Sequence, residues 1–321
     1  MDADSHWPRA PLPWQTETWQ RLVSLLHADT FPHSILAAGP HNIGKQHFLS
    51  ALAGLLLCED SSAGTACGKC RNCHLLDVAT HPDIMLVSPE EDSRVIKIDQ
   101  IRSVLDFASM TPGISQRKVI LIGPAEAMNI NAANALLKCL EEPTESTLLM
   151  LFSHRASTLP ATLRSRCQTL AMGLPSHGQS MEWLEQVTGS AQISEQLLEV
   201  SNQRPLLAKR YFLQDKLGQQ LALHRGVDEL LQGGISALEF PSVVADLELV
   251  DVLALMQSRL ELLLRNRVLE GNGPPTRPGF VLRDELARLQ QAVASGANPN
   301  RQLTIEDCAA RLARAVGDGA T

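Results

Sequence analysis

The sequence predicts an α/β domain with a parallel sheet, followed by two helical domains. Over residues 1–172, short apolar runs typical of buried strands alternate with segments of helical periodicity, a pattern that implies a parallel sheet with helices on both faces. After about residue 173 only helical patterns remain. We therefore predict an α/β domain over 1–172, a small helical lid domain over 173–214 and a helical bundle over 215–321.

The individual elements follow from runs and periodicities along the chain. Apolar runs predict strands over 34–38, 84–87, 95–98, 118–122, 148–152 and 168–172. Helical spacing in the first domain predicts helices over 14–27, 48–57, 100–108 and 131–142. The lid is predicted to hold three short helices with breaks near 188–190 and 202–205, and the bundle helices over 219–231, 244–269, 281–294 and 304–316.

Composition and charge exclude several classes of protein. The 321 residues carry 28 Lys and Arg against 35 Asp and Glu, a net charge of −7 that disfavours a globally basic nucleic-acid-binding surface. Aromatic residues make up only 4%, which disfavours base stacking as the main mode of action. No apolar run approaches the ~20 residues of a membrane-spanning helix, and the first residues lack a signal-peptide pattern. We expect a cytoplasmic protein.

A phosphate-loop pattern stands between the first strand and its helix. Gly39, four residues, Gly44 and Lys45 match the loop in which backbone N–H groups and a lysine surround phosphates. The next residue is Gln46, where a Ser or Thr hydroxyl normally binds Mg²⁺. One magnesium anchor is therefore missing.

The second magnesium anchor is missing as well. A carboxylate is expected at the end of the strand 118–122, yet the chain continues with Gly123 and Pro124. Glu126 is either a substitute carboxylate or, the interpretation we favour, a solvated residue at a helix start. The loss of both anchors argues against ATP hydrolysis and makes ATP binding by this chain doubtful.

Four of the seven cysteines fall within sixteen residues. Cys58, Cys67, Cys70 and Cys73 have the tight spacings of a tetrahedral zinc site with four thiolate ligands. Such a site leaves no open position for a reactive water, so we predict structural Zn²⁺ in a module over 58–73. An iron–sulfur cluster and free buried cysteines are the alternatives; the closing Cys-Pro of ferredoxin-type sites is absent.

These motifs together resemble the AAA+ clamp-loader family of bacterial DNA polymerase III. The resemblance lies in the phosphate loop, the cysteine module after the loop helix, the string Asn134-Ala-Leu-Leu-Lys-Cys-Leu-Glu-Glu-Pro143 and the triplet Ser165-Arg166-Cys167. It covers the first 170 residues in order and spacing, whereas the second half resembles the family only in its layout of lid and helical collar.

The resemblance implies a role for this chain within an assembly. The degenerate magnesium site is typical of the delta prime branch of the family, which does not hydrolyse ATP, rather than of the gamma/tau branch. Arg166, with Ser165 beside it, would then be an arginine finger acting in trans on ATP held by a neighbouring subunit. Arg204 is either a nucleotide-sensing residue or, as we favour, structural. The implied partners are gamma/tau and delta subunits, the sliding clamp and primed DNA.

Two rival functions stay open at this point. One is an ATP-hydrolysing gamma/tau-type subunit with an atypical magnesium site in which Glu126 is the substitute carboxylate. The other is a zinc-dependent nucleic-acid-binding module attached to an inert scaffold. Hydrolysis of Mg-ATP by the isolated chain would favour the first, and tight, salt-dependent DNA binding by the isolated chain would favour the second.

Overall fold

The structure is a computed structural model, and it separates into two compact units. It describes residues 6–61, 64–90, 93–142, 144, 146–245, 247–269, 277–294 and 297–317. The first unit extends to Ser194 and includes Gln203–Lys209, and the second comprises Glu195–Asn202 and the chain from Arg210 onward.

A parallel sheet forms the centre of the first unit, as the sequence predicted, and it has five of the six predicted strands. The strand order is β2-β3-β4-β1-β5, and every neighbouring pair is parallel. The strands are β1 (Ser34–Ala38), β2 (Ile84–Val87), β3 (Lys118–Ile122), β4 (Thr147–Ser153) and β5 (Gln168–Ala171). Because β3 and β4 are buried on both faces, they are continuous rather than alternating apolar runs.

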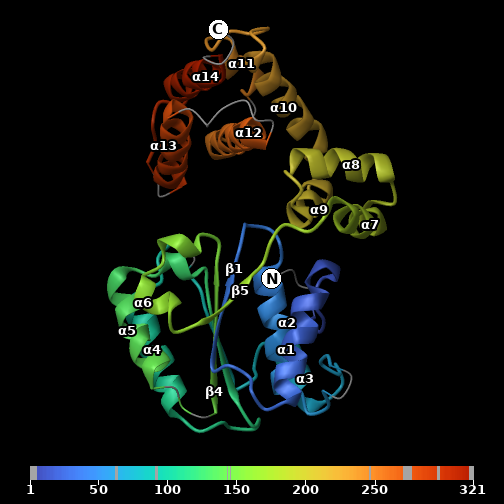
Figure 1. Cartoon of the computed structure of the whole chain (residues 1–321), viewed down its shortest axis with the longest axis vertical. Helices are drawn as coiled ribbons and strands as arrows, with labels where there is room; N and C mark the ends of the chain where they lie inside the picture. Colours follow the sequence, from blue (N-terminus) through green and yellow to red (C-terminus); the bar gives the residue numbers. More distant parts are fainter. Residues whose placement is uncertain are drawn as a thin grey trace. The chain divides into compact units, whose positions relative to one another are not determined.

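Helices cover both faces of this sheet. The helices of the first domain are α1 (Thr16–His27), α2 (Lys45–Leu57), α3 (Arg71–Asp77), α4 (Ile98–Ser109), α5 (Ile130–Glu141) and α6 (Ala161–Arg164), with short 3₁₀ turns at Pro13–Gln15 (η1), Ala125–Ala127 (η2) and Ala156–Thr158 (η3). Figure 1 shows α1, α2 and α3 on one face and α4, α5 and α6 on the other. Successive residues of β3 belong to different hydrophobic clusters. Val119 lies in the same cluster as Phe48 of α2, and Ile120 lies in the same cluster as Leu136 of α5.

Several element predictions differ from the structure. The predicted strand over 95–98 is wrong: Ile96 makes only an isolated bridge to Met128, and α4 already begins at Ile98. Helix α2 begins at Lys45, directly after the phosphate loop, rather than at residue 48. The sequence did not predict α3, which lies within and beyond the cysteine module. Pro143, which was expected to close the helix 131–142, lies outside the described residues.

Three short helices follow the α/β domain, as predicted. They are α7 (His177–Thr188), α8 (Ala191–Val200) and α9 (Pro205–Leu213). Positive φ angles at Gly189, Asn202 and Gln203 mark the two breaks between them. The boundary between the two compact units runs through α8 and α9, and the three-domain division remains a prediction.

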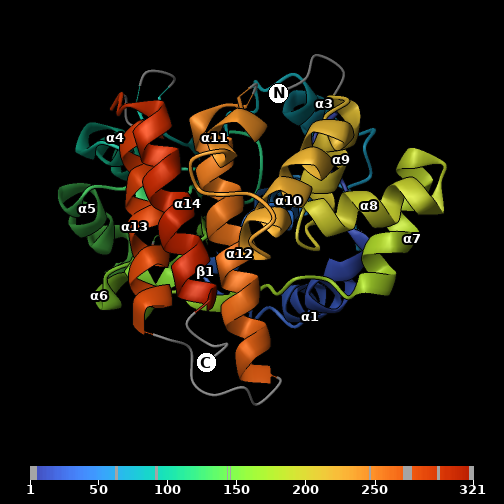
Figure 2. The same ribbon diagram turned by 90° about the horizontal axis from the view of Figure 1, so that it is seen from above.

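The second unit is a helical bundle. The helices after α9 are α10 (Leu217–Leu231), α12 (Leu249–Leu269), α13 (Arg277–Ala294) and α14 (Arg301–Gly317), together with the short α11 (Phe240–Val243). Figure 2 shows α12, α13 and α14 side by side, and their apolar faces meet around Met256, Leu286 and Ile305. The predicted helix over 244–269 is too long at its start, because α12 begins at Leu249. None of the described helices is long and apolar enough to cross a membrane.

Candidate functional site

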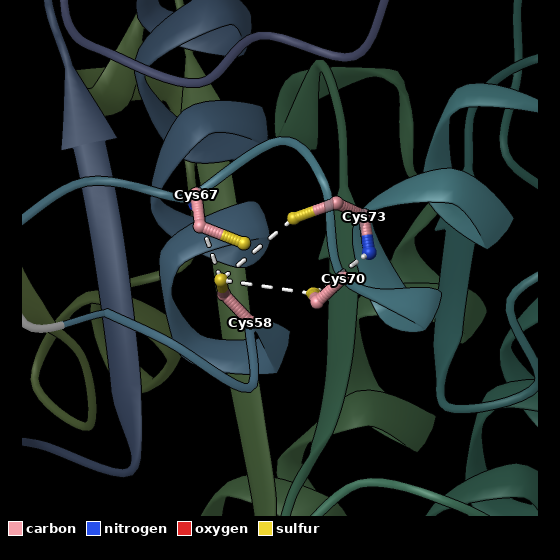
Figure 3. Close-up of side chains that lie close together, drawn as sticks. All are labelled: Cys58, Cys67, Cys70 and Cys73. Carbon is pink, nitrogen blue, oxygen red and sulfur yellow. Dashed lines mark hydrogen bonds between the residues drawn. The ribbon is translucent and has the colours of Figure 1, made fainter.

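The four predicted zinc ligands converge in space. Their Sγ atoms all lie within 4.8 Å of one another, and Cys58 is 3.9 Å from Cys70 and 3.7 Å from Cys73 (Figure 3). A tetrahedral zinc ion with Zn–S bonds of about 2.3 Å requires sulfur–sulfur distances of about 3.8 Å. The cluster therefore fits a zinc ion in a closed four-thiolate shell.

Local structure holds these cysteines in position. Cys58 follows the last residue of α2, and Cys70 is the N-cap of α3, whose N–H at Cys73 donates to the Cys70 sulfur. The N–H of Cys67 donates to the Cys58 sulfur at 3.2 Å, and the side-chain amide of Asn72 donates to the Leu57 carbonyl at 2.7 Å. Because α2 and α3 are joined in this way, the thiols from both helices meet at one point.

The electrostatic environment differs among the thiols. A backbone N–H at Lys69 lowers the pKa of the Cys67 thiol to about 7, whereas burial raises the pKa of the Cys73 thiol. N–H···S hydrogen bonds stabilise thiolate, the form that binds metal. A bound Zn²⁺ would deprotonate the buried thiol as well.

The phosphate loop has the expected backbone, but its lysine is bonded to the loop itself. Gly44 has φ +86°, and a Cβ at Gly39 would collide with the Met172 carbonyl, so both positions need glycine. Lys45 is buried, and its ammonium donates to the carbonyls of Gly39, at 2.8 Å, and Pro40. Burial lowers the pKa of Lys45 to about 8, although the Glu126 carboxylate opposes that shift.

Neither expected magnesium anchor is present. Gln46 has an exposed side chain on the first turn of α2. At Gly123 an added Cβ would lie within 2.7 Å of the ring atom Cζ of Phe152, closer than side chains approach one another. Phe152 is itself buried on β4. A carboxylate at position 123 is absent from the sequence, and it would require the Phe152 ring to move.

Two histidines that the sequence analysis missed lie in this region with Glu126. The rings of His41, in the phosphate loop, and His154, just after β4, stack with centroids 3.6 Å apart. The Glu126 carboxylate accepts the N–H of His154 at 2.9 Å, so it is not simply solvated. Burial lowers the pKa of His41 to about 4 and that of His154 to about 3. No spacing in the sequence links these residues, because each follows a different strand.

His41 and His154 line a cavity of about 640 Å³. Its lining residues are His6, Trp7, Pro8, His41, Asn42, Gly44, Lys45, Gln46, His47, Ser50, Leu86, Phe152, His154 and Leu206. Arg204, at the start of α9, lies close enough to lower the pKa of His41 further, and its Nε atom is buried without a partner among the described residues. The structure thus places Arg204 near the phosphate loop.

Arg166 lies between α6 and β5, where it is held from two sides. The Ser34 hydroxyl of β1 donates to its backbone carbonyl at 2.6 Å. Its guanidinium makes an ion pair with Glu141 at 2.6 Å and donates to the Thr162 carbonyl at 3.0 Å, and 35% of the side chain is exposed. Glu141 belongs to the Asn134–Pro143 string, so two separate sequence motifs meet here. The hydroxyl of Ser165 also donates to the Thr162 carbonyl.

A phosphate loop on a parallel sheet, a cysteine module after the loop helix and trailing helical elements define a P-loop protein of the AAA+ clamp-loader class. Residues 14–175 match the family model described as DNA polymerase III, delta subunit. The chain is 42% identical over 228 residues to DNA polymerase III subunit delta' of Pseudomonas aeruginosa, with 70% of this chain and 68% of the relative covered. The chain therefore belongs to the DNA polymerase III delta prime family, whose members are clamp-loader components.

More distant relatives match shorter segments. The delta' subunit of Escherichia coli is 32% identical over 172 residues, which cover 54% of this chain and about half, 52%, of that relative. The tau subunit of Escherichia coli is 31% identical over 164 residues, 48% of this chain and 25% of the relative.

Proposed function

We propose that this chain is a stator of the DNA polymerase III clamp loader that hydrolyses no ATP itself and donates Arg166 in trans to a neighbouring ATPase subunit. Membership in the delta prime family supports the assembly. The proposed partners are gamma/tau and delta subunits, with the sliding clamp and primed DNA bound within the assembled ring in the cytoplasm. The second unit, a separate bundle with apolar helix faces, is the proposed site of subunit association.

The observation that carries the absence of hydrolysis is the packing of Phe152 against Gly123. A magnesium-dependent ATPase needs a carboxylate at the end of β3 to hold the ion and activate water. The Phe152 ring fills the space of any side chain at position 123. Lys45 also directs two of its three N–H donors to the Gly39 and Pro40 carbonyls rather than to a phosphate.

The trans role of Arg166 rests on its chemistry and its exposure. A guanidinium presents a planar fork of donors that suits the charge developing on a transferred phosphoryl group. The exposed part of Arg166 is available to a neighbouring subunit, and the ion pair with Glu141 limits the conformations of the side chain. The backbone of Arg166 is fixed to β1 through Ser34, which ties the residue to the sheet.

We propose further that the cysteine cluster holds one structural Zn²⁺. Cys58, Cys67, Cys70 and Cys73 would supply all four ligands, and the ion would fix α3 to the end of α2. With no coordination position left for water or substrate, the ion would contribute stability rather than catalysis.

The experiment that tests the trans role compares Arg166→Ala with Arg164→Ala in reconstituted clamp-loader complexes. Arg164 is an exposed arginine two positions away, so it controls for the loss of a surface charge. We expect Arg166→Ala to lower DNA- and clamp-stimulated hydrolysis at the served ATP site by about 10³-fold or more, with zinc content and assembly unchanged. Site-resolved pre-steady-state hydrolysis avoids dilution by the other sites. Equal rates for both variants would refute the role of Arg166.

A second measurement tests the absence of intrinsic hydrolysis. The isolated chain should turn over no Mg-ATP in the steady state, and Lys45→Ala should change nothing. Turnover of about 0.1 per second or more that Lys45→Ala abolishes would instead favour a gamma/tau-type ATPase with an atypical magnesium site.

A further inference from the structure

Three loops that follow β1, β3 and β4 bring two imidazoles and a carboxylate together. His41 lies in the loop after β1, Glu126 in η2 after β3 and His154 directly after β4. One ligand atom from each residue lies within 4.8 Å of the other two. These residues come from three separated parts of the chain, so their convergence is a property of the fold rather than of a local sequence run.

Two polar atoms of this cluster are buried without a hydrogen-bond partner. Within the described part of the chain, nothing pairs with Oε2 of Glu126 or Nδ1 of His154. The other carboxylate oxygen, Oε1, accepts the backbone N–H of His154 at 2.9 Å, which ties the carboxylate to the main chain at that residue. Buried polar atoms without partners are costly, and a ligand between them would remove that cost.

From this arrangement we propose a second metal site in this chain, in which His41, His154 and Glu126 bind one divalent first-row transition ion. Two imidazoles and one carboxylate form a three-sided ligand set that leaves other coordination positions open to water or an anion. This site is separate from the four cysteines, and it requires no clamp-loader activity. The bound ion would connect the loops after β1, β3 and β4.

The ligand atoms lie within 4.8 Å of one another, so small side-chain movements are needed to bind an ion. Metal–nitrogen bonds of about 2.1 Å place two ligands on one ion roughly 3 Å apart. The His41 and His154 rings are already stacked with an interplanar angle of 25°. Because the two ring planes are nearly parallel, the rings must rotate out of the stack before a nitrogen of each can face one ion.

The surrounding charges select the kind of ion. Lys45, Arg155 and Arg204 lie close enough to act electrostatically on His41. Magnesium, held mainly by charge and by oxygen ligands, is disfavoured next to three cations and a single carboxylate. Ions that bind imidazole nitrogen strongly, such as Co²⁺, Ni²⁺ and Zn²⁺, gain enough from two such bonds to offset this repulsion.

The test is a titration of the full chain, as purified, with Co²⁺. Cobalt bound to thiolates gives an intense charge-transfer absorption, and cobalt bound only to nitrogen and oxygen does not. We expect one Co²⁺ per chain that binds without the thiolate band, measured by calorimetry and visible absorption. Glu126→Gln, which preserves the hydrogen-bond acceptor for His154, and His154→Ala should each weaken this binding by about tenfold or more.

His47 provides the matched control. It lines the same cavity, but its ring contacts the Ala10 carbonyl and is not part of the cluster. His47→Ala should leave the cobalt affinity unchanged, and thermal denaturation identifies any variant that fails to fold. Cobalt that binds only with the thiolate band, or equal weakening by His47→Ala and Glu126→Gln, would overturn the proposal.

Discussion

The cysteine cluster and the phosphate loop lie at opposite ends of the same helix, α2. The cysteine cluster has a full set of ligands for an ion, whereas the phosphate loop lacks side chains that a nucleotide site needs. At the end of α2, four sulfur atoms converge at distances that suit one ion. At its start, the loop keeps its glycine turn, while Gln46 is exposed and Lys45 is bonded to the loop carbonyls. The turn also joins β1 to α2, so the fold preserves it without a nucleotide. A side chain at position 46 that served only to bind Mg²⁺ would have no such structural role.

The largest expected effect comes from removing the cysteine site. Cys70→Ser combined with Cys73→Ser should abolish the bound zinc and lower the melting temperature by about 10 °C, because a structural metal contributes several kcal/mol to folding. Metal analysis and thermal denaturation measure both. Cys139→Ser, which changes a half-buried cysteine of α5 far from the cluster in sequence, is the control. Zinc retained by the double variant would show that these cysteines are not ligands.

The next effect tests whether the phosphate loop can be repaired. Gly123→Asp restores a carboxylate in the sequence but forces it against the Phe152 ring. We expect a loss of about 3 kcal/mol in the free energy of unfolding and no gain of ATP hydrolysis, since overpacking and a buried charge both destabilise. Chemical denaturation and steady-state turnover are the measurements.

Gly178→Asp is the matched control for that substitution. A Cβ at Gly178, in the first turn of α7, meets nothing within 4 Å, and an acidic residue there suits the helix N-terminus. This variant should therefore be as stable as the parent. If Gly123→Asp were equally stable and hydrolysed ATP, the phosphate loop would be a repairable site and the contrast with the cysteine cluster would fail.

Local sequence signals predicted the cysteine cluster and the phosphate loop, because neighbouring residues build both. Cys67, Cys70 and Cys73 lie close in the chain, and the strand–loop–helix pattern around Gly44 depends only on adjacent segments. The sheet was predictable for the same reason, since buried parallel strands are continuous apolar runs. The predicted strand over 95–98 is wrong because Ile96 forms only an isolated bridge and Ile98 is the first residue of α4, although both are apolar.

Long-range contacts could not be predicted in this way. The contacts of Phe152 with Gly123, of His41 with His154 and of Arg166 with Glu141 join segments that only the folded sheet brings together. Sequence periodicity gives the face of an element that is buried, not the residue that meets it. Glu126 shows the consequence: as an isolated carboxylate it was interpreted as solvated, and in the structure it binds the His154 N–H.

A smaller effect is expected from Asp83, which supports the cysteine module without being a metal ligand. Asp83 is buried and accepts N–H hydrogen bonds from Gly113, Ile114 and Ser115, and the Ser115 hydroxyl accepts from Asn72 of α3. Burial tends to raise the pKa of Asp83, but the three N–H donors outweigh it and hold the pKa below its usual value. Asp83→Asn should cost about 2 kcal/mol of unfolding free energy at pH 7, without loss of zinc.

The pH dependence of that cost follows from the depressed pKa. A carboxylate with a lowered folded-state pKa stabilises the fold at pH above its unfolded value of about 3.9, and the contribution is lost as pH falls through the folded value. The stability difference between parent and Asp83→Asn should therefore shrink below about pH 4. Denaturation curves at pH 7 and at about pH 3 would reveal this, and a difference that stays constant would show that Asp83 acts by shape alone.

The smallest expected effect concerns Glu141, because its ion pair with Arg166 is partly exposed. Such pairs contribute about 0–1 kcal/mol, so Glu141→Gln and Arg166→Ala should each leave the unfolding free energy within about 1 kcal/mol of the parent. In this respect Arg166 is the opposite of the cysteines, because the trans role proposed for it requires little support from its own core. Chemical denaturation of both variants and of their double mutant measures the coupling. A loss of several kcal/mol in either single variant would make the pair a structural element, and any loss of hydrolysis in the assembled complex would then follow from misfolding rather than from the missing guanidinium.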